Sequence, residues 1–140
     1  MFVVLDTNHF RELRENSLAG QRLRDRITES AADVFISIVA AEESLHGRVI
    51  FIRRSRAGAA QVEGYARLHT CIEALHKLTI LPFDHDAAAQ FDALEKLRLR
   101  IGSMDQKIAA ICLSHDALLL SRNLVDFQKV PGLRAENWLD

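Results

Sequence analysis

The first eight residues constrain the fold of this chain more than any other segment. Residues 2–5 are an apolar run without alternation, and Asp6, Thr7 and Asn8 follow it directly. Such a run is typical of a strand in a parallel sheet that is covered on both faces. Ligands of open α/β sheets bind beyond the carboxyl ends of the strands, so Asp6 is a candidate for chemistry. An equally consistent interpretation is that Asp6 or Thr7 caps a helix that begins near His9.

Further short apolar runs recur along the chain and alternate with stretches of helical periodicity. We expect strands at residues 34–37, 79–81 and 117–121, and an edge strand at 133–138 after the turn at Pro131 and Gly132. Alternating strands and helices predict an α/β fold with a parallel sheet. At 140 residues, with no repeat or linker, the chain fits a single domain spanning 1–140.

Capping residues and apolar spacing place the helices between these strands. Ser37 and Asp84 are expected N-caps, and Ser103 with Gln106 has the pattern of a capping box. Apolar residues at helical spacing are predicted to form one stripe over 88–101 and to recur through a long helix over 59–77. The expected helical stretches are one after Asn8 that breaks near Gly20, one from Ile38, one over 59–77, one after Asp84, one after Ser103 and a short turn at Asp126 and Phe127.

Acidic residues stand at several of the predicted strand ends and helix starts. Asp105 lies in the first turn of an apolar helix, and Asp126 follows the strand that ends at Ser121. Glu42 and Glu43 are adjacent in a helix, so at most one of them faces the same pocket. Ionised carboxylates share a cleft only if they take up protons or bind a cation, and oxygen ligands favour Mg²⁺ or Mn²⁺. Each acid taken alone is also explained as a helix cap or a partner of the helix dipole.

Composition excludes several other classes of protein. The net charge of −1 argues against a general polyanion-coating protein, which needs many Lys and Arg contacts to phosphates. The apolar start is too short for a secretory signal and no run reaches membrane-spanning length, so we expect a cytosolic protein with no membrane association. Cys71 and Cys112 are expected to be reduced core residues. The scattered histidines suggest no zinc site and are expected at the surface or its boundary.

Four segments in order carry a resemblance that spans the chain: V-V-L-D-T-N, I-S-I-V-A-A-E-E-S-L-H-G, M-D-Q-K-I-A-A-I-C-L-S-H and L-L-L-S-R-N-L-V-D-F-Q-K-V-P-G-L-R-A-E-N-W. Together they resemble the PIN domain, most closely the VapC-type toxins of bacterial toxin–antitoxin modules. The resemblance implies a three-layer α/β/α sandwich around a central parallel sheet. It also implies a magnesium-dependent endoribonuclease that forms a homodimer and binds an antitoxin protein.

The resemblance assigns the metal-binding and catalytic acids to Asp6, Glu43, Asp105 and Asp126. Glu43 is preferred over Glu42 because it stands four residues before Gly47, as in the E-L-x-x-G pattern of the family. Polar neighbours that would orient water are Thr7, Asn8, Ser121 and Asn123. Two departures are that Ser44 follows Glu43, and that Asn123 stands where some relatives carry an Asp, which would weaken a second metal site.

Two other functions compete with a nuclease. One is a binding module with a degenerate PIN fold whose acids no longer hold metal. The other is a receiver-type phosphoacceptor, which the sequence disfavours because Arg122 rather than a lysine follows the late strand. For a nuclease, the candidate contacts to the RNA backbone are Arg11, Arg14 and the cluster at Arg53–Arg56, although a solvated helix end also explains that cluster.

Overall fold

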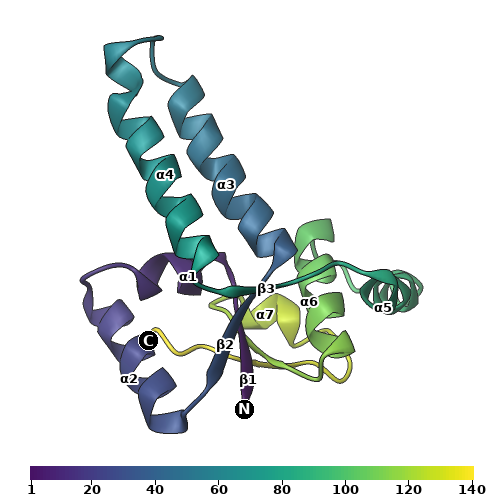
Figure 1. Cartoon of the computed structure of the whole chain (residues 1–140). Helices are drawn as coiled ribbons and strands as arrows, with labels where there is room; N and C mark the ends of the chain where they lie inside the picture. The colour runs from purple at the N-terminus through teal and green to yellow at the C-terminus, as the bar shows by residue number, and fades with distance from the viewer.

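The computed structural model describes residues 1–140, and its centre is a five-stranded parallel sheet (Figure 1). The strand order is β3-β2-β1-β4-β5, so β1 lies in the middle and every neighbouring pair is parallel. The expected strands are confirmed, and the edge strand is shorter than predicted. The strands are β1 (Phe2–Leu5), β2 (Asp33–Ser37), β3 (Thr79–Leu81), β4 (Leu118–Leu120) and β5 (Arg134–Glu136).

Helices cover both faces of the sheet, which confirms the α/β/α arrangement (Figure 1). α3 and α4 pack against each other as a hairpin that projects away from the sheet, here called the arm. No helix is both long enough and apolar enough to span a membrane. The helices are α1 (Thr7–Leu13), α2 (Leu18–Ser30), α3 (Ile38–Arg53), the 3₁₀ turn η1 (Ala59–Gln61), α4 (Val62–His76), α5 (His85–Glu95), α6 (Ser103–Ser114) and α7 (Leu124–Phe127).

The core is built around the central strands and α6. Val3, Val4 and Leu5 of β1 are fully buried, as a strand covered on both faces requires. Cys71 and Cys112 are free and buried, as predicted. The prediction of a surface or boundary position is wrong for His9, which is fully buried; its Nε2 accepts a hydrogen bond from the backbone N–H of Trp138 at 3.2 Å. This contact ties the first helix to the end of the chain.

Two predicted helix boundaries are wrong. The chain does not break at Gly20, which lies inside α2, because Ser17 begins this helix by accepting a hydrogen bond from the N–H of Gly20 at 3.0 Å. Ser103 is not an N-cap: Gly102 holds that position, and the Gln106 side chain donates to Glu95 at 2.9 Å instead of closing a capping box. Local patterns alone did not distinguish these neighbouring positions.

Both predicted apolar stripes are only partly buried. α5 ends at Glu95 because Arg98 and Arg100 adopt positive φ angles of 50° and 59°, so the stripe over 88–101 is interrupted and Leu97 is exposed. On α4, Tyr65 and other apolar side chains are exposed, since the arm extends beyond the sheet and has only α3 to pack against (Figure 1). Apolar residues at helical spacing predict these helices, but the spacing contains no information about which element packs against each face.

Candidate active site

The candidate site lies where β1 and β4 end. Asp6 follows β1 directly and is the N-cap of α1, with its Oδ1 accepting from the N–H of Thr7 at 2.8 Å. The backbone N–H of Asp6 donates to the carbonyl of Leu120 at 2.9 Å, which joins the ends of the two strands. Asp6 therefore has both of the predicted roles: it caps α1, and it places a carboxylate at the edge of the sheet.

Glu43 reaches this edge from the second turn of α3. Ser37 begins α3 by accepting from the N–H of Ala40 at 3.0 Å, which fixes the register of the helix at the end of β2. Glu43 is half-buried and its Oε1 accepts from the hydroxyl of Thr7 at 3.4 Å, whereas Glu42 is exposed. Of the two adjacent glutamates, Glu43 is the one that lies beside Asp6 and Thr7.

Asn123 brings the remaining two acids together. Its side-chain amide donates to Asp105 Oδ2 at 3.1 Å and to Asp126 Oδ2 at 3.0 Å. Asp105 lies in the first turn of α6, and Asp126 also pairs with Lys129 at 3.2 Å. Lys129 was not predicted from the sequence, although its position three residues after Asp126 indicates such an ion pair.

Ser121 links the two halves of the site. This serine is fully buried, and its hydroxyl donates to Asp6 Oδ2 at 2.8 Å while accepting from the backbone N–H of Asn123 at 3.0 Å. A continuous hydrogen-bonded path therefore runs from Asp6 through Ser121 and Asn123 to Asp105 and Asp126. Asn8 is the exception among the predicted polar neighbours, because it is exposed and its side chain makes no hydrogen bond within the chain.

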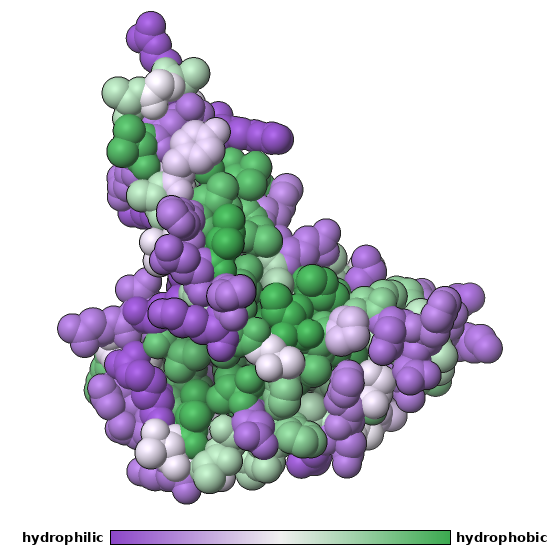
Figure 2. Space-filling view, in the orientation of Figure 1, coloured by the Kyte–Doolittle hydropathy of each residue, from purple (hydrophilic) through white to green (hydrophobic).

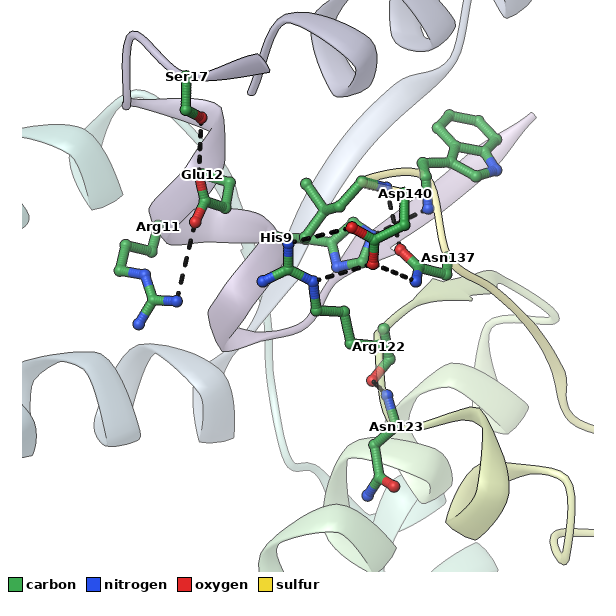
Figure 3. A network of polar contacts seen from close by, with 11 residues as sticks. His9, Arg11, Glu12, Ser17, Arg122, Asn123, Asn137 and Asp140 are labelled. Atoms are coloured by element: carbon green, nitrogen blue, oxygen red, sulfur yellow. Dashed lines mark hydrogen bonds and ion pairs between the residues drawn. The ribbon is translucent and has the colours of Figure 1, made fainter. Parts of the chain in front are cut away.

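The C-terminal residues hold the loop that carries Ser121 and Asn123 (Figure 3). Asp140 pairs with Arg122 at 3.2 Å and accepts from the side chain of Asn137 at 2.8 Å. These hydrogen bonds lower the pKa of the Asp140 carboxyl, with Asn137 contributing more than Arg122. Arg122, which lies between Ser121 and Asn123, is thus held by residues outside the site.

The electrostatics show that the acids lie within range of one another. Burial raises the pKa of Glu43, and the charges of Asp6 and Asp105 raise it further. Burial also raises the pKa of Asp105, with Asp6 adding to the effect and the hydrogen bond from Asn123 opposing it. By contrast, hydrogen bonds from Asn123 and Lys129 lower the pKa of Asp126. Asp6, Glu43 and Asp105 therefore form the repelling centre, and Asp126 lies at its neutralised edge.

The donor set suits a hard divalent cation, because every candidate ligand is a carboxylate oxygen. Burial first, and then repulsion from neighbouring acids, raises the pKa values of Glu43 and Asp105, and a bound cation would offset both by stabilising the ionised carboxylates. No three acidic, histidine or cysteine side chains lie close enough to form a closed metal cage. The amide of Asn123 is bonded to oxygens of Asp105 and Asp126, so it competes with a cation for those ligands.

Comparison with known proteins decides the family. Residues 3–133 match the family described as the PIN domain. The chain belongs to the PIN domain family. This PIN domain is 25% identical to the tRNA(fMet)-specific endonuclease VapC of Salmonella typhimurium over 122 residues, which are 84% of this chain and 85% of that protein. It is 41% identical to Ribonuclease VapC2 of Haemophilus influenzae over 69 residues, 46% of this chain and 52% of that protein.

Solved structures of similar fold come from toxin–antitoxin complexes. The structure of VapBC-1 from nontypeable Haemophilus influenzae contains a chain that matches with a TM-score of 0.77 at 20% identity, covering 100% of both chains. A chain of VapBC2 from Rickettsia felis, bound to a DNA fragment from their promoter, matches with a TM-score of 0.73 at 22% identity, covering 99% of both chains. At this identity the likeness establishes the PIN fold.

Proposed function

We propose that this PIN domain is a Mg²⁺- or Mn²⁺-dependent endoribonuclease and the toxin of a toxin–antitoxin pair. The observation that carries the proposal is the convergence of Asp6, Glu43 and Asp105 at the ends of β1 and β4, where Thr7 bonds to Glu43 and to Asp6, and Ser121 and Asn123 link Asp6 to Asp105. Carboxylates so arranged at the ends of parallel strands are suited to hold a divalent ion. Support also comes from relatives named as an endonuclease and a ribonuclease.

Asp6, Glu43 and Asp105 are the residues that would hold the ion, with Asp126 at the edge of the same site. A bound divalent ion polarises a phosphodiester and lowers the pKa of a coordinated water. Ser121 orients Asp6 through its 2.8 Å hydrogen bond, and Thr7 orients Glu43. Asn123 spaces Asp105 from Asp126, and Lys129 compensates the charge of Asp126.

The proposed partners are RNA as substrate, an antitoxin protein and a second copy of the chain, all in the cytosol. The similar chains of solved structure come from VapBC complexes, which supports the antitoxin. The arm carries exposed apolar side chains, among them Val62 and Tyr65, that a protein partner would bury. Figure 2 shows apolar surface along the arm, flanked by hydrophilic side chains.

The nuclease is tested by incubating the purified protein with total RNA in Mg²⁺ or Mn²⁺, with and without a chelator. We expect cleavage that requires the metal and that Asp6→Asn abolishes, because this change removes one anionic ligand from the centre of the site. Cleavage that persists in chelator and in Asp6→Asn would exclude the mechanism. No cleavage by the intact protein would favour a binding module with a PIN fold.

Glu43→Gln and Glu42→Gln form a matched pair for the same assay. The two residues are adjacent in α3 and undergo the same loss of one charge, but only Glu43 lies within the acidic centre. We expect Glu43→Gln to reduce the cleavage rate by 10²-fold or more, on the order of the loss when a metal ligand or its support is removed. Glu42→Gln should cleave at the unmodified rate, and equal losses in both variants would contradict the assignment.

A further inference from the structure

A groove lined with arginines leads away from the candidate site along α1 and the arm. Its inner part is a cavity of about 370 Å³ that includes Thr7 and Glu43 in its lining. Its outer part is a cavity of about 520 Å³, and both parts share the same three residues, Arg11, Arg14 and Arg48. These two cavities together are called the arginine groove. Figure 2 shows hydrophilic side chains gathered where the arm meets the body of the molecule.

The arginine groove carries excess positive charge in a chain whose net charge is −1. Four arginines and one glutamate line the inner cavity, and four arginines and two glutamates line the outer one. One of those glutamates, Glu63, is already paired with Arg67 at 2.6 Å. Arg11 has only a 3.8 Å ion pair with Glu12, which itself accepts from Ser17 (Figure 3). Arg14, Arg48 and Arg54 are thus the arginines of the groove that make no ion pair within the chain.

Arg14 is the most constrained of these cations. Its guanidinium stacks over the ring of Phe10 at 4.6 Å, and its Nε is buried without a hydrogen-bond partner. Neither Arg14 nor Arg48 makes an ion pair or a side-chain hydrogen bond. Burial lowers the pKa of Arg14, and the charge of Arg48 lowers it further. A guanidinium held on an aromatic face is oriented in advance for bidentate binding of an oxyanion.

The lining of the groove favours a phosphate backbone over a protein segment. Protein partners dock by burying aromatic and aliphatic anchors, yet Ala66 is the one hydrophobic residue of the outer cavity. Arginine forks bind phosphate oxygens, and contacts to the backbone fix the position of a nucleic acid. The groove also begins at Thr7 and Glu43, so a strand lying in it leads directly to the acidic centre.

We propose that the arginine groove binds the phosphodiester backbone of single-stranded RNA on one side of the cleaved bond. This inference rests on the proposed ribonuclease function and names the positioning residues of that site. Arg14 and Arg48 line both the inner and the outer cavity, so both contact the backbone where it passes from one cavity to the other. The sequence-predicted cluster at Arg53–Arg56 contributes Arg54 alone to the lining of the groove, because Arg53 and Arg56 line neither cavity.

The test measures binding separately from cleavage. A fluorescently labelled single-stranded RNA is titrated with the full-length protein in chelator, and anisotropy is recorded over a series of salt concentrations. For Arg14→Gln and Arg48→Gln we expect binding about 5- to 10-fold weaker, with the slope of log affinity against log salt reduced by about 0.7 for each lost contact. Arg53→Gln and Arg56→Gln, exposed at the end of the arm, serve as matched controls and should bind normally.

Arg48→Gln keeps the test decisive if Arg14→Gln fails to fold, because Arg48, unlike Arg14, makes no cation–π contact that the change would remove. Unchanged affinity and salt slope in Arg48→Gln would overturn the proposal, as expected if an acidic protein segment occupies the groove. In Mg²⁺, we expect the same variant to raise KM with little change in kcat. RNA binding that depends on Arg48 without any cleavage would refute the ribonuclease and leave the groove supported. Cleavage by Arg48→Gln with an unaltered KM would support the ribonuclease and refute RNA binding by the groove.

Discussion

Ser121 offers the sharpest test of how the site is assembled. It is fully buried and connects Asp6 to the backbone of Asn123 through one donated and one accepted hydrogen bond of 2.8 and 3.0 Å. Ser121→Ala removes both bonds without adding volume or charge. The variant leaves the carboxylate of Asp6 with one donor fewer and the N–H of Asn123 without its side-chain acceptor.

The expected loss follows from these two bonds. A hydrogen bond to a charged group contributes about 1.5–3 kcal/mol and a neutral one about 1 kcal/mol, with partial exposure of Asp6 reducing the first value. We therefore expect the free energy of unfolding to fall by about 2–3 kcal/mol. For a chain of this size, 1 kcal/mol moves Tm by about 3–4 °C, so the predicted decrease in Tm is about 6–12 °C.

Ser37→Ala is the matched control. Ser37 is also fully buried at the end of a strand, β2, but its hydroxyl accepts only from the N–H of Ala40. Losing this helix cap costs about 1 kcal/mol, or about 3–4 °C in Tm, and should lower the cleavage rate less than Ser121→Ala does, because Asp6 and Asn123 keep their hydrogen bonds. Calorimetry and the RNA cleavage assay are run on both variants. Equal decreases in Tm, or an undiminished cleavage rate in folded Ser121→Ala, would refute the proposed link through Ser121.

Three further predictions concern pH, metal and packing. Burial lowers the pKa of His9 from 6.5 to about 4, so between these pH values His9 is protonated in the unfolded chain but not in the folded one. His9 should therefore lower the free energy of unfolding by about 2 kcal/mol from pH 7 to pH 5. Thermal melts of His9→Gln should show a weaker dependence on pH. Mg²⁺ should raise Tm more at pH 8 than at pH 5, because the raised pKa values of Glu43 and Asp105 leave them less ionised in acid; an equal increase would contradict the shared site. Gly20→Ala should destabilise the fold by about 1–3 kcal/mol in denaturant titrations, because its Cβ meets the carbonyls at the end of α1, whereas Gly47→Ala in open space should stabilise α3 by up to about 1 kcal/mol.

The order of the elements and the convergence of the acids could be predicted from the sequence because both depend on local patterns. The run at residues 2–5 is apolar on both faces and ends in Asp6, and the run before Ser121 repeats this arrangement. In a parallel sheet, such endings lie on one edge whatever the strand order. Asp105 could be predicted as a candidate acid from its position alone, in the first turn of a buried helix.

Features that depend on distant partners could not be predicted. The burial of His9 is explained by Trp138, which lies 129 positions further along the chain. The arginine groove is likewise assembled from α1, α3 and α4, so Arg14 and Arg48 become neighbours only through the packing of the arm. The sequence indicated Arg11, Arg14 and the arginines near residue 53 as candidate RNA contacts, but it contains no information about which helices face one another, so Arg48 was not predicted.

Asn123 was predicted only in part from the sequence. Its position after a strand marked it as a polar neighbour, but the sequence did not show that its amide would bond to both Asp105 and Asp126. A neutral donor at this point lets the two carboxylates lie close together without a cation. An aspartate in its place would add repulsion that only a metal or a proton relieves. An asparagine rather than an aspartate at position 123 therefore makes the folded site less dependent on metal. Repulsion among Asp6, Glu43 and Asp105 remains, and it favours the binding of a cation.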